Sequence, residues 1–427
     1  MKVLIVGGGG REHAIALKIK ENPEVTALYA APGNGGIAQI ATCLPFKATD
    51  VDGIVRWAAE NKVDFVIVAP DDPLCLGMVD ALAAQGIPAF GPRKNAAIIE
   101  GSKVFSKNLM KKYGIPTAAY ETFDDYDAAV KYLQTADMPI VVKADGLALG
   151  KGVLICPDRE SAVEAVASMM KEAKFGASGA RVVIEEFLTG PEVSVLAFTD
   201  GKTVKPMVSS MDHKRALDHD EGLNTGGMGT IAPNPCYTPE LARRCMDEIF
   251  LPTIAAMNTE GRTFTGCLYF GLMMTPKGPK VIEYNCRFGD PETQVVLPLL
   301  KSDLLTIMRA TVDGTLADTP VEFASGAACC VVLASGGYPV SYKSGYPISG
   351  LDEAGKTATV FHAGTKLVDG QIVTAGGRVL GVTATANTLE AAIDKAYQAA
   401  DKITFTDMHM RRDIGQSALA SRKESHS

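Results

Sequence analysis

The chain lacks the features that mark secreted, membrane-spanning and nucleic-acid-binding proteins. Its nine cysteines are scattered and form no C-x-x-C pair, so the sequence indicates reduced thiols rather than a disulfide framework or a zinc site. No apolar run approaches the ~20 residues that span a bilayer, and the N-terminal run MKVLIVGGGG is too short for a signal peptide. The net charge is −7, without the overall basic character of a nucleic-acid-binding protein. We therefore expect a cytoplasmic protein with no membrane partner and no nucleic-acid partner.

What the chain does contain is enough apolar sequence for several domains. It has 427 residues, of which 47% are hydrophobic and 21% charged, so we expect two to four domains with a large core. The N-terminal part alternates short apolar strands with amphipathic helices. This pattern predicts a parallel α/β sheet covered on both faces, with strands at 2–6, 25–30, 65–70 and 86–91.

The middle and C-terminal parts follow an α+β pattern. A helix over 95–113 ends at Gly114, and residues 117–190 alternate strands and helices as a small lid would. Strands then dominate to about residue 300, interrupted by a polar loop at 211–235 and a helix near 238–259. Short strands and one helix predict a C-terminal α+β domain, followed by a disordered tail SRKESHS. We predict domains at 1–103, 104–325 and 326–427.

Two glycine turns follow neighbouring N-terminal strands. Glycines 7–10 directly precede a helix, where backbone N–H groups bind anions, and the turn APGNGG at 31–36 follows the next strand. A nicotinamide site is disfavoured, because the third glycine of its motif would fall on Glu12 or His13 and no acidic residue ends the second strand. Either turn alone could be purely structural. The pair, at the carboxyl ends of adjacent strands, predicts a sugar-phosphate pocket.

A lysine and a glycine-rich hairpin suggest a nucleotide site in the middle of the chain. In PIVVKADGLALGKGVLI (139–155), Lys143 ends an apolar run, which is unusual unless an anion pairs with it. Glycine lets backbone N–H groups approach phosphate oxygens, although no Walker A ending G-K-[ST] is present. A lysine beside a flexible turn is the alternative interpretation. Downstream, RVVIEEFLTGPEVSV breaks at Gly190-Pro191, either as a simple strand bend or to contact an adenine edge.

The segment PKVIEYNCRFGDPETQ (279–294) carries the clearest chemistry. Glu283, Asn285 and Arg287 alternate after an apolar strand, so they share one face. Carboxylate and amide oxygens suit Mg²⁺, whose remaining positions are usually taken by phosphate and water. Arg287 would then face a transferring phosphoryl group or an anionic substrate. A surface strand end with a salt bridge is the alternative.

Taken together, these segments resemble the glycinamide ribonucleotide synthetases, a family of the ATP-grasp superfamily. The likeness covers about residues 1–420 and is carried by VGGGGREHA, EGSKVFSK, VVKADGLALGKGV, EEFLTGPEVSV, DHKRALDHDEGLNTGGMG, VIEYNCRFGDPETQ and VVLASGGYP. The pair NTGGMG and RFGDPETQ is specific to this family. The lysines and the E-x-N pattern belong to the wider superfamily.

The resemblance implies an ATP-grasp fold with a Rossmann-like N-terminal domain and a small C-terminal α+β domain. It also implies a reaction in which ATP, with Mg²⁺ or Mn²⁺, phosphorylates the carboxylate of glycine. The amine of 5-phosphoribosylamine then attacks the acyl phosphate, giving glycinamide ribonucleotide, ADP and phosphate in purine synthesis. A monomer is the family expectation.

The family's functional positions can be carried over to matching residues of this sequence. For ATP, the resemblance implies Lys103, Lys143, Gly150, Gly152, Glu185, Glu186, Leu188 and Glu192, with the metal on Glu283 and Asn285. For catalysis it implies Arg287, Lys143, Lys214 and Asp212. For the substrates it implies Gly9, Gly10, Arg11, Glu12, Asn34, Asp72, Asn224, Thr225, Gly226, Gly227 and Gly229.

The sequence departs from the usual pattern at three positions. Gly271 stands where many ATP-grasp enzymes have a third acidic metal ligand, Leu149 replaces an alanine of the lid, and APDDPL replaces GPEAPL, which we interpret as Asp72 in place of glutamate. The alternatives that the sequence leaves open are another ATP-grasp carboxylate–amine ligase and a nucleotide-binding module without catalysis.

Overall fold

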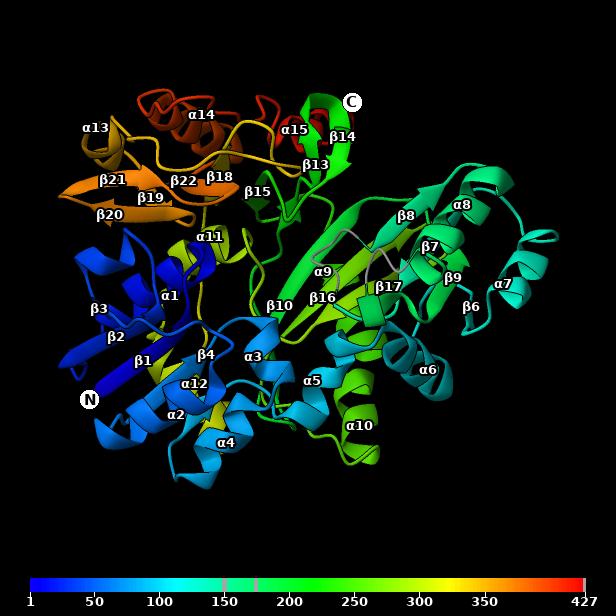
Figure 1. Cartoon of the computed structure of the whole chain (residues 1–427), viewed down its shortest axis with the longest axis horizontal. Helices are drawn as coiled ribbons and strands as arrows, with labels where there is room; N and C mark the ends of the chain where they lie inside the picture. Colours follow the sequence, from blue (N-terminus) through cyan, green and yellow to red (C-terminus); the bar gives the residue numbers. More distant parts are fainter. Residues whose placement is uncertain (148–151, 173–175, 425–427) are drawn as a thin grey trace.

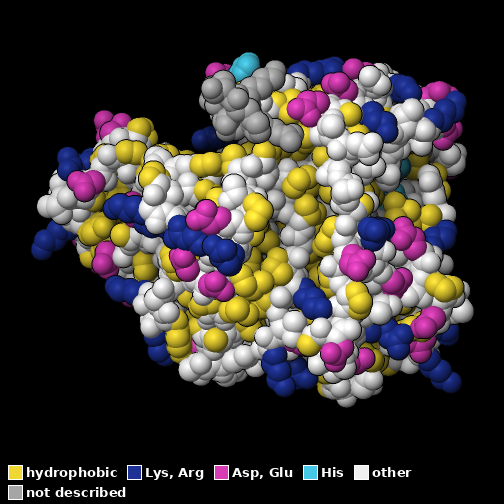
Figure 2. All heavy atoms as spheres, turned by 180° about the vertical axis from the view of Figure 1, so that it is seen from behind, with side chains coloured by type: hydrophobic (Ala, Val, Ile, Leu, Met, Phe, Trp, Pro, Cys, Tyr) yellow, Lys and Arg dark blue, Asp and Glu magenta, His cyan; other side chains and the backbone are white. Residues whose placement is uncertain are grey.

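Four sheets of four or five strands organise the residues that the computed structural model describes, 1–147, 152–172 and 176–424. In Figure 1 the N-terminal sheet lies at the lower left and the C-terminal sheet lies above it, while two antiparallel sheets fill the centre and right. Figure 2, from behind, shows the lid as a lobe projecting from the body, with acidic and basic side chains interspersed over this face.

The N-terminal sheet confirms the predicted parallel arrangement. Its strand order is β3-β2-β1-β4-β5, and all pairs are parallel. The strands are β1 Lys2–Gly7, β2 Ala27–Pro32, β3 Thr42–Cys43, β4 Phe65–Val68 and β5 Ala89–Phe90. Helices on its faces and edges are α1 Gly10–Lys20, α2 Val51–Glu60, α3 Asp71–Cys75, α4 Met78–Ala84 and α5 Lys94–Gly101, with a short 3₁₀ turn Ile37–Gln39. The two glycine turns follow β1 and β2, and α3 follows β4. Because the strands are parallel, all three lie at the carboxyl ends of the strands.

The helix predicted over 95–113 is interrupted at Ser102, which is a correction to the sequence interpretation. Ser102 is extended, with φ −139° and ψ 115°, and its hydroxyl caps the next helix, α6 Lys103–Tyr113. The same hydroxyl donates to Asp145 Oδ1 at 2.9 Å, a contact from the lid that no local pattern reveals. The predicted end at Gly114 is confirmed, because this glycine has φ 69°.

The lid has the predicted order of strand, helix, two strands, helix and strand. Its sheet, in the order β6-β9-β7-β8, is antiparallel and consists of β6 Tyr120–Phe123, β7 Ile140–Ala144, β8 Val153–Cys156 and β9 Val182–Glu186. The helices α7 Tyr126–Leu133 and α8 Arg159–Met170 cover it, followed by the 3₁₀ turn Gly176–Gly179. A small apolar core of its own, separate from the clusters of the body, lies between this sheet and the two helices.

The central sheet supplies the platform that faces the lid. Its order is β11-β10-β16-β17, with β10 Glu192–Thr199, β11 Val204–Pro206, β16 Gly266–Thr275 and β17 Gly278–Asn285. The helix predicted near 238–259 is present as α9 Pro239–Cys245, a π-helical turn Met246–Phe250 and α10 Leu251–Thr259. Beyond β17 come α11 Thr293–Val296, a 3₁₀ turn Leu297–Leu299, α12 Leu304–Asp313 and a 3₁₀ turn Leu316–Asp318.

The C-terminal sheet crosses the boundary that the sequence predicts at residue 326. Its order is β12-β15-β18-β22-β19, with β12 Met211–Asp212, β15 Gly229–Ala232, β18 Ala327–Ala334, β19 Thr359–His362 and β22 Arg378–Ala386. The segment predicted as a polar loop, 211–235, thus contributes two strands, β12 and β15, to this sheet. Between them the same segment forms a separate two-stranded ribbon, β13 Arg215–Leu217 with β14 Glu221–Asn224, joined by the 3₁₀ turn Asp218–Asp220. Strand pairing over a gap of about a hundred residues leaves no local signal in the sequence.

The remaining elements cover the C-terminal sheet. They are α13 Leu351–Gly355, the ribbon β20 Thr365–Val368 and β21 Gln371–Thr374, α14 Leu389–Ala400 and α15 Gln416–Glu424. The predicted disordered tail begins at residue 421, whereas α15 continues to Glu424, because this stretch has neither glycine nor proline to end a helix. Within the described ranges, no helix has the length and apolarity needed to cross a bilayer.

Candidate functional site

The polar face predicted at the end of β17 is present. Glu283, Asn285 and Arg287 are partly exposed, while the intervening Tyr284 and Cys286 are buried. Arg287 lies beyond the strand end, but its Nη2 donates to Asn285 Oδ1 at 3.3 Å, so the row continues without a break. The strand therefore presents an acid, an amide and a guanidinium together.

Four cations from different segments act on Glu283. Burial alone would raise the pKa of this carboxyl, but the charges of Lys214, Lys143, Lys103 and Arg287 outweigh burial and hold the pKa below its ordinary value. Lys214 is the first of these, with its Nζ 3.7 Å from Glu283 Oε1. Glu283 is thus an ionised oxygen donor surrounded by positive charge, an environment suited to a polyphosphate and a divalent ion.

Lys143 has the anionic partner that its apolar surroundings demand. That partner is Glu185, whose carboxylate is buried between Lys143 and Lys107 and forms an ion pair with each. Burial raises the pKa of Glu185, but the two lysine charges outweigh it and the pKa lies below its usual value. The side chain predicted to line an adenine hinge is therefore already engaged with two lysines. Lys107 itself carries no sequence signal that separates it from its neighbouring lysines.

Lys103 and the glycine-rich hairpin lie together. Lys103 Nζ donates to Gly146 O at 2.9 Å, just before the hairpin, and burial lowers the pKa of this amine despite the nearby Glu283. Gly152 O accepts from Ala144 N at 2.8 Å, which extends the pairing of β7 and β8 by one residue beyond Lys143 and Val153. The predicted phosphate contact Gly150, like Leu149 and Lys151, falls outside the described residues.

The remaining predicted nucleotide contacts surround the break after β9. Glu186 is exposed and its Oε2 accepts from Ala119 N at 3.2 Å, while Leu188 is half-buried. Gly190 has φ +143° and passes so close to Met274 that a Cβ there would meet its carbonyl oxygen at 2.1 Å, so the break requires glycine. Glu192, at the start of β10, is exposed, with its Oε2 3.5 Å from Lys214 Nζ.

A buried glutamate that the sequence interpretation missed holds Arg287. Glu100, on α5, accepts from Arg287 Nη2 at 2.8 Å and from Cys286 N at 2.7 Å. Burial lowers the pKa of Arg287, but the charges of Glu100 and Asp71 outweigh it and raise that pKa. Arg287 Nε is a buried donor with no hydrogen-bond partner among the described residues, so one N–H group of the guanidinium is unsatisfied. A lone charge in the apolar run AAIIEG was the only available signal for Glu100.

The predicted substrate loop folds over this face. Thr225 Oγ1 donates to Lys214 O at 2.8 Å and accepts from Gly227 N at 3.0 Å, which fixes the turn between them. Burial and the neighbouring Glu292 carboxylate raise the pKa of Asp212 well above its ordinary value. Two other members of the loop lie at its ends: Asn224 in β14, paired with Arg215, and Gly229 at the start of β15.

The first glycine turn is occupied by a side chain of its own helix. Glu12 accepts from Gly9 N at 2.7 Å and pairs with Arg11 Nε at 2.8 Å. Glu12 is 1% exposed, so the structure places it as a cap of α1 rather than as a surface for a ligand. A Cβ on Gly10 would meet Gln294 Nε2 at 2.4 Å, so this glycine permits close packing.

Asn34 joins the two glycine turns, which do lie side by side as predicted. Its Nδ2 donates to Gly8 O at 3.0 Å and to His362 O at 2.8 Å, and its Oδ1 accepts from Gly36 N at 3.0 Å. Gly33 N donates to Gly7 O at 3.1 Å. The amide of Asn34 is therefore used in holding the two turns together.

The acid of APDDPL that faces the site is Asp71, not the predicted Asp72. Asp72 is exposed, whereas Asp71 interacts with Arg287 and Arg11, whose charges outweigh burial and lower its pKa. Burial and the Asp71 charge raise the pKa of Asp72. Asp71 begins α3, and successive helix positions point about 100° apart, so only one of the two acids can face the glycine turns.

The donor set fits a magnesium ion that shares its coordination with phosphate. Glu283 and Asn285 supply two hard oxygens, and Gly271 lies opposite Glu283 in the β16–β17 register, so that position of the neighbouring strand adds no acid. Among the described residues, no group of three or more His, Cys, Asp or Glu side chains could hold a metal alone. Phosphate and water oxygens would complete the shell.

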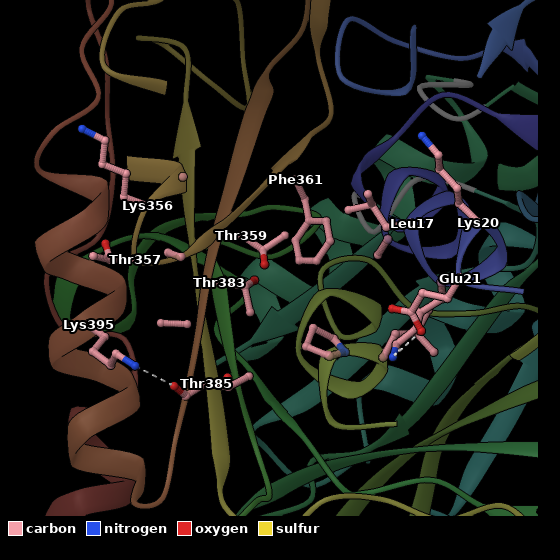
Figure 3. Close-up of a pocket in the computed structure, with 17 residues that line it drawn as sticks. Leu17, Lys20, Glu21, Lys356, Thr357, Thr359, Phe361, Thr383, Thr385 and Lys395 are labelled. Carbon is pink, nitrogen blue, oxygen red and sulfur yellow. Dashed lines mark hydrogen bonds and ion pairs between the residues drawn. The ribbon is translucent and has the colours of Figure 1, made fainter. Parts of the chain in front are cut away.

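A separate cavity lies away from this face. Its volume is about 730 Å³, and Figure 3 shows it between α1, which contributes Leu17, Lys20 and Glu21, and strands β19 and β22. None of the residues predicted for the site lines it.

Comparison with known proteins extends over nearly the whole chain. The family models named Phosphoribosylglycinamide synthetase match as N domain over residues 1–100, ATP-grasp (A) domain over 101–293 and C domain over 328–417. The phosphoribosylamine–glycine ligase of Halalkalibacterium halodurans is 49% identical over 422 residues, 99% of this chain and 98% of that protein. The ligase of the same name from Agrobacterium fabrum is 48% identical over 423 residues, 99% and 100% of the two chains.

Solved structures agree. The crystal structure of phosphoribosylamine–glycine ligase from Thermotoga maritima has a TM-score of 0.86 at 34% identity and covers 97% of this chain and 100% of that one. A biotin carboxylase from Campylobacter jejuni, in a β-γ-ATP complex, has a TM-score of 0.73 at 15% identity, covering 96% and 92%. At that identity the second likeness concerns the fold alone.

Proposed function

The chain belongs to the phosphoribosylglycinamide synthetase family and has phosphoribosylamine–glycine ligase activity in purine biosynthesis, and we propose how its residues carry out that reaction. The ATP-grasp domain binds ATP. The single observation that carries the proposal is the convergence of Lys103, Lys143, Lys214 and Arg287 on Glu283. With ATP bound, the lysines would neutralise charge on the triphosphate, and Arg287 would act on the phosphoryl group in transfer.

In the proposed complex, Lys103 and Lys143 both bind ATP phosphates. Lys143 would weaken its ion pair with Glu185 and form one with an ATP phosphate. Lys107 would remain paired with the Glu185 carboxylate and hold it in place. Glu283 and Asn285 would hold Mg²⁺ or Mn²⁺, which supplies charge neutralisation between the phosphates. The backbone around Glu186 and Leu188 would contact the adenine, and Glu192 the ribose.

Arg287 would stabilise the phosphoryl group as it passes to glycine. Glu100 holds one edge of the guanidinium and so fixes Arg287 beside Asn285. The glycine carboxylate attacks the γ-phosphorus, ADP leaves, and glycyl phosphate forms. Phosphoryl transfer depends on positioning and charge stabilisation rather than on a covalent catalyst, so a fixed arginine is sufficient.

The second half-reaction would take place between the substrate loop and the N-terminal glycine turns. The amine of 5-phosphoribosylamine attacks the acyl carbon, phosphate leaves, and a proton is released from the nitrogen. Asp212, which lies beside Gly227 in the substrate loop, would receive that proton. Arg11 and Asp71 would face the sugar phosphate and ribose, and the lid would exclude water from the acyl phosphate.

The direct test is an assay of purified protein with ATP, Mg²⁺, glycine and freshly prepared phosphoribosylamine. We expect ADP release that requires both glycine and the amine. ADP release without glycine dependence would contradict the proposed reaction. We also propose that the protein is cytoplasmic and monomeric. Light scattering of the purified protein would check the oligomeric state.

The metal role of β17 has its own test. We expect Glu283→Ala to raise the Mg²⁺ concentration needed for half-maximal turnover about tenfold or more, because one of two protein oxygens is lost. The measurement is a Mg²⁺ titration of ADP formation at saturating ATP. Glu248→Gln is the control and leaves the titration unchanged; its partly exposed ion pair with Arg244 lies beside Gly278, at the opposite end of β17 from Glu283. An unchanged titration for Glu283→Ala would remove this residue from the metal site.

A further inference from the structure

Two residues of the C-terminal region contact the backbone of the proposed substrate loop. Arg378, the first residue of β22, donates through Nη1 to Gly226 O at 2.8 Å and to Asp290 O at 2.8 Å, with Gly227 O at 3.4 Å. Tyr338, in the segment SGGYP, accepts through its hydroxyl from Gly226 N at 3.1 Å. Arg378 and Tyr338 thus connect three segments, 224–229 (NTGGMG), 287–294 (RFGDPETQ) and 335–339 (SGGYP).

Two glycines at this junction are required because neighbouring side chains fill the space that a Cβ would occupy. A Cβ on Gly226 would lie 2.9 Å from Arg378 Cζ, inside the space of the guanidinium. A Cβ on Gly377 would lie 2.3 Å from Tyr338 Cδ2, inside the space of the ring. Both glycines therefore leave room for the side chains that touch the loop.

The opposite side of the loop faces Asp212 and Pro291. Gly227 has φ +120°, and a Cβ there would meet Asp212 Oδ1 at 2.6 Å and Pro291 Cδ at 2.5 Å. The loop is therefore held between Asp212 on one side and Arg378 with Tyr338 on the other. A glycine-rich loop has many backbone conformations when free, so contacts that select one of them reduce the entropic cost of ordering it around a substrate.

We propose that Arg378 and Tyr338 are positioning residues that hold loop 224–229 in its substrate-binding conformation, so that the C-terminal sheet sets the affinity for glycine. This inference rests on the proposed place of the loop beside the acyl group in the second half-reaction, and it assigns the loop to the substrate that carries this group, glycine. Neither side chain needs to touch the substrate. Arg378 also lies near the Asp290 carboxylate, with Nη2 3.6 Å from Oδ1, which keeps its guanidinium directed at the loop.

Steady-state kinetics of two variants test this proposal. Arg378→Met removes the carbonyl contacts, and we expect the KM for glycine to rise about tenfold or more while the KM for ATP stays within about twofold. Tyr338→Phe removes one hydroxyl and keeps the ring, so we expect a smaller rise, about threefold. Arg378→Lys restores a single donor and should recover part of the glycine affinity. Arg412→Met, which breaks an exposed ion pair with Asp401, is the control with unchanged kinetics.

Hydrogen exchange provides a readout that does not depend on turnover. In Tyr338→Phe the amide of Gly226 loses its acceptor, so peptides covering 224–229 should exchange faster, and saturating glycine should slow them again. Equal increases of the KM for ATP and glycine, or unchanged exchange in this loop, would overturn the positioning role. If the wild type itself shows no glycine-dependent ADP release, the proposed function fails; an active wild type with unchanged variants refutes only this inference.

Discussion

At the scale of single residues, the arginine at the centre of the site depends on a buried acid. Arg287 is fixed by Glu100, and the Glu100 carboxylate also caps the Cys286 amide. Burial raises the pKa of Glu100 even against the opposing charge of Arg287. Truncating one member of a buried ion pair leaves the other without its counter-charge, so stability and catalysis are linked at this position.

This linkage predicts that Arg287→Met abolishes measurable turnover and lowers the free energy of unfolding by about 3 kcal/mol, while ATP affinity stays nearly intact. Denaturant unfolding and nucleotide titration measure the two effects. The double variant Arg287→Met with Glu100→Gln should recover most of the stability and none of the turnover. Recovery of turnover in the double variant, or a large loss of ATP affinity in the single one, would contradict the role of Arg287.

At the scale of elements, α6 and the two lid strands β7 and β9 meet at one carboxylate. Lys107 from α6 and Lys143 from β7 both pair with Glu185 from β9, and Lys107 Nζ also donates to Thr117 Oγ1 at 2.8 Å. Burial lowers the pKa of Lys107 to about 8, against the opposing charge of Glu185. The lid is therefore joined to α6 through charges that depend on each other.

We expect Glu185→Gln to lower the free energy of unfolding by about 3 kcal/mol, because two buried lysines lose their common anion. Adding Lys107→Met should restore part of that loss, since an apolar side chain of similar length replaces an unpaired charge. Urea unfolding at neutral pH compares the variants. A Glu185→Gln protein as stable as the wild type would show that this triad is not needed for the lid to fold.

At the scale of the whole molecule, two buried histidines join the first and last domains. His13 on α1 accepts through Nδ1 from His362 N at 2.8 Å, and the two rings pack edge to face. Burial, reinforced by the His362 charge, lowers the pKa of His13 to about 3, and burial lowers that of His362 to about 4. Both imidazoles are therefore neutral in the folded protein at neutral pH.

These lowered pKa values make the folded protein less stable as the pH falls. Between about pH 6.5 and pH 3 the unfolded chain binds a proton at His13 that the folded protein excludes, so stability falls as the pH falls. At about pH 5 this costs about 2 kcal/mol for His13 alone. We expect the unfolding midpoint of the wild type to drop more between pH 7.5 and about pH 5 than that of His13→Gln, measured by differential scanning calorimetry. Parallel decreases in the two proteins would exclude His13 as a cause.

The sequence by itself determined what depends on local pattern: the parallel N-terminal sheet, the lid order, the helix end at Gly114 and the Glu283–Asn285–Arg287 face, together with the family. Side-chain alternation and glycine positions encode these features within a few residues. Only the tertiary structure decided which charges meet. Glu100 with Arg287, Glu185 with two lysines, and the pairing of β12 and β15 with the C-terminal sheet all join segments distant in sequence. Electrostatic energy depends on distance and burial, and a linear sequence contains neither.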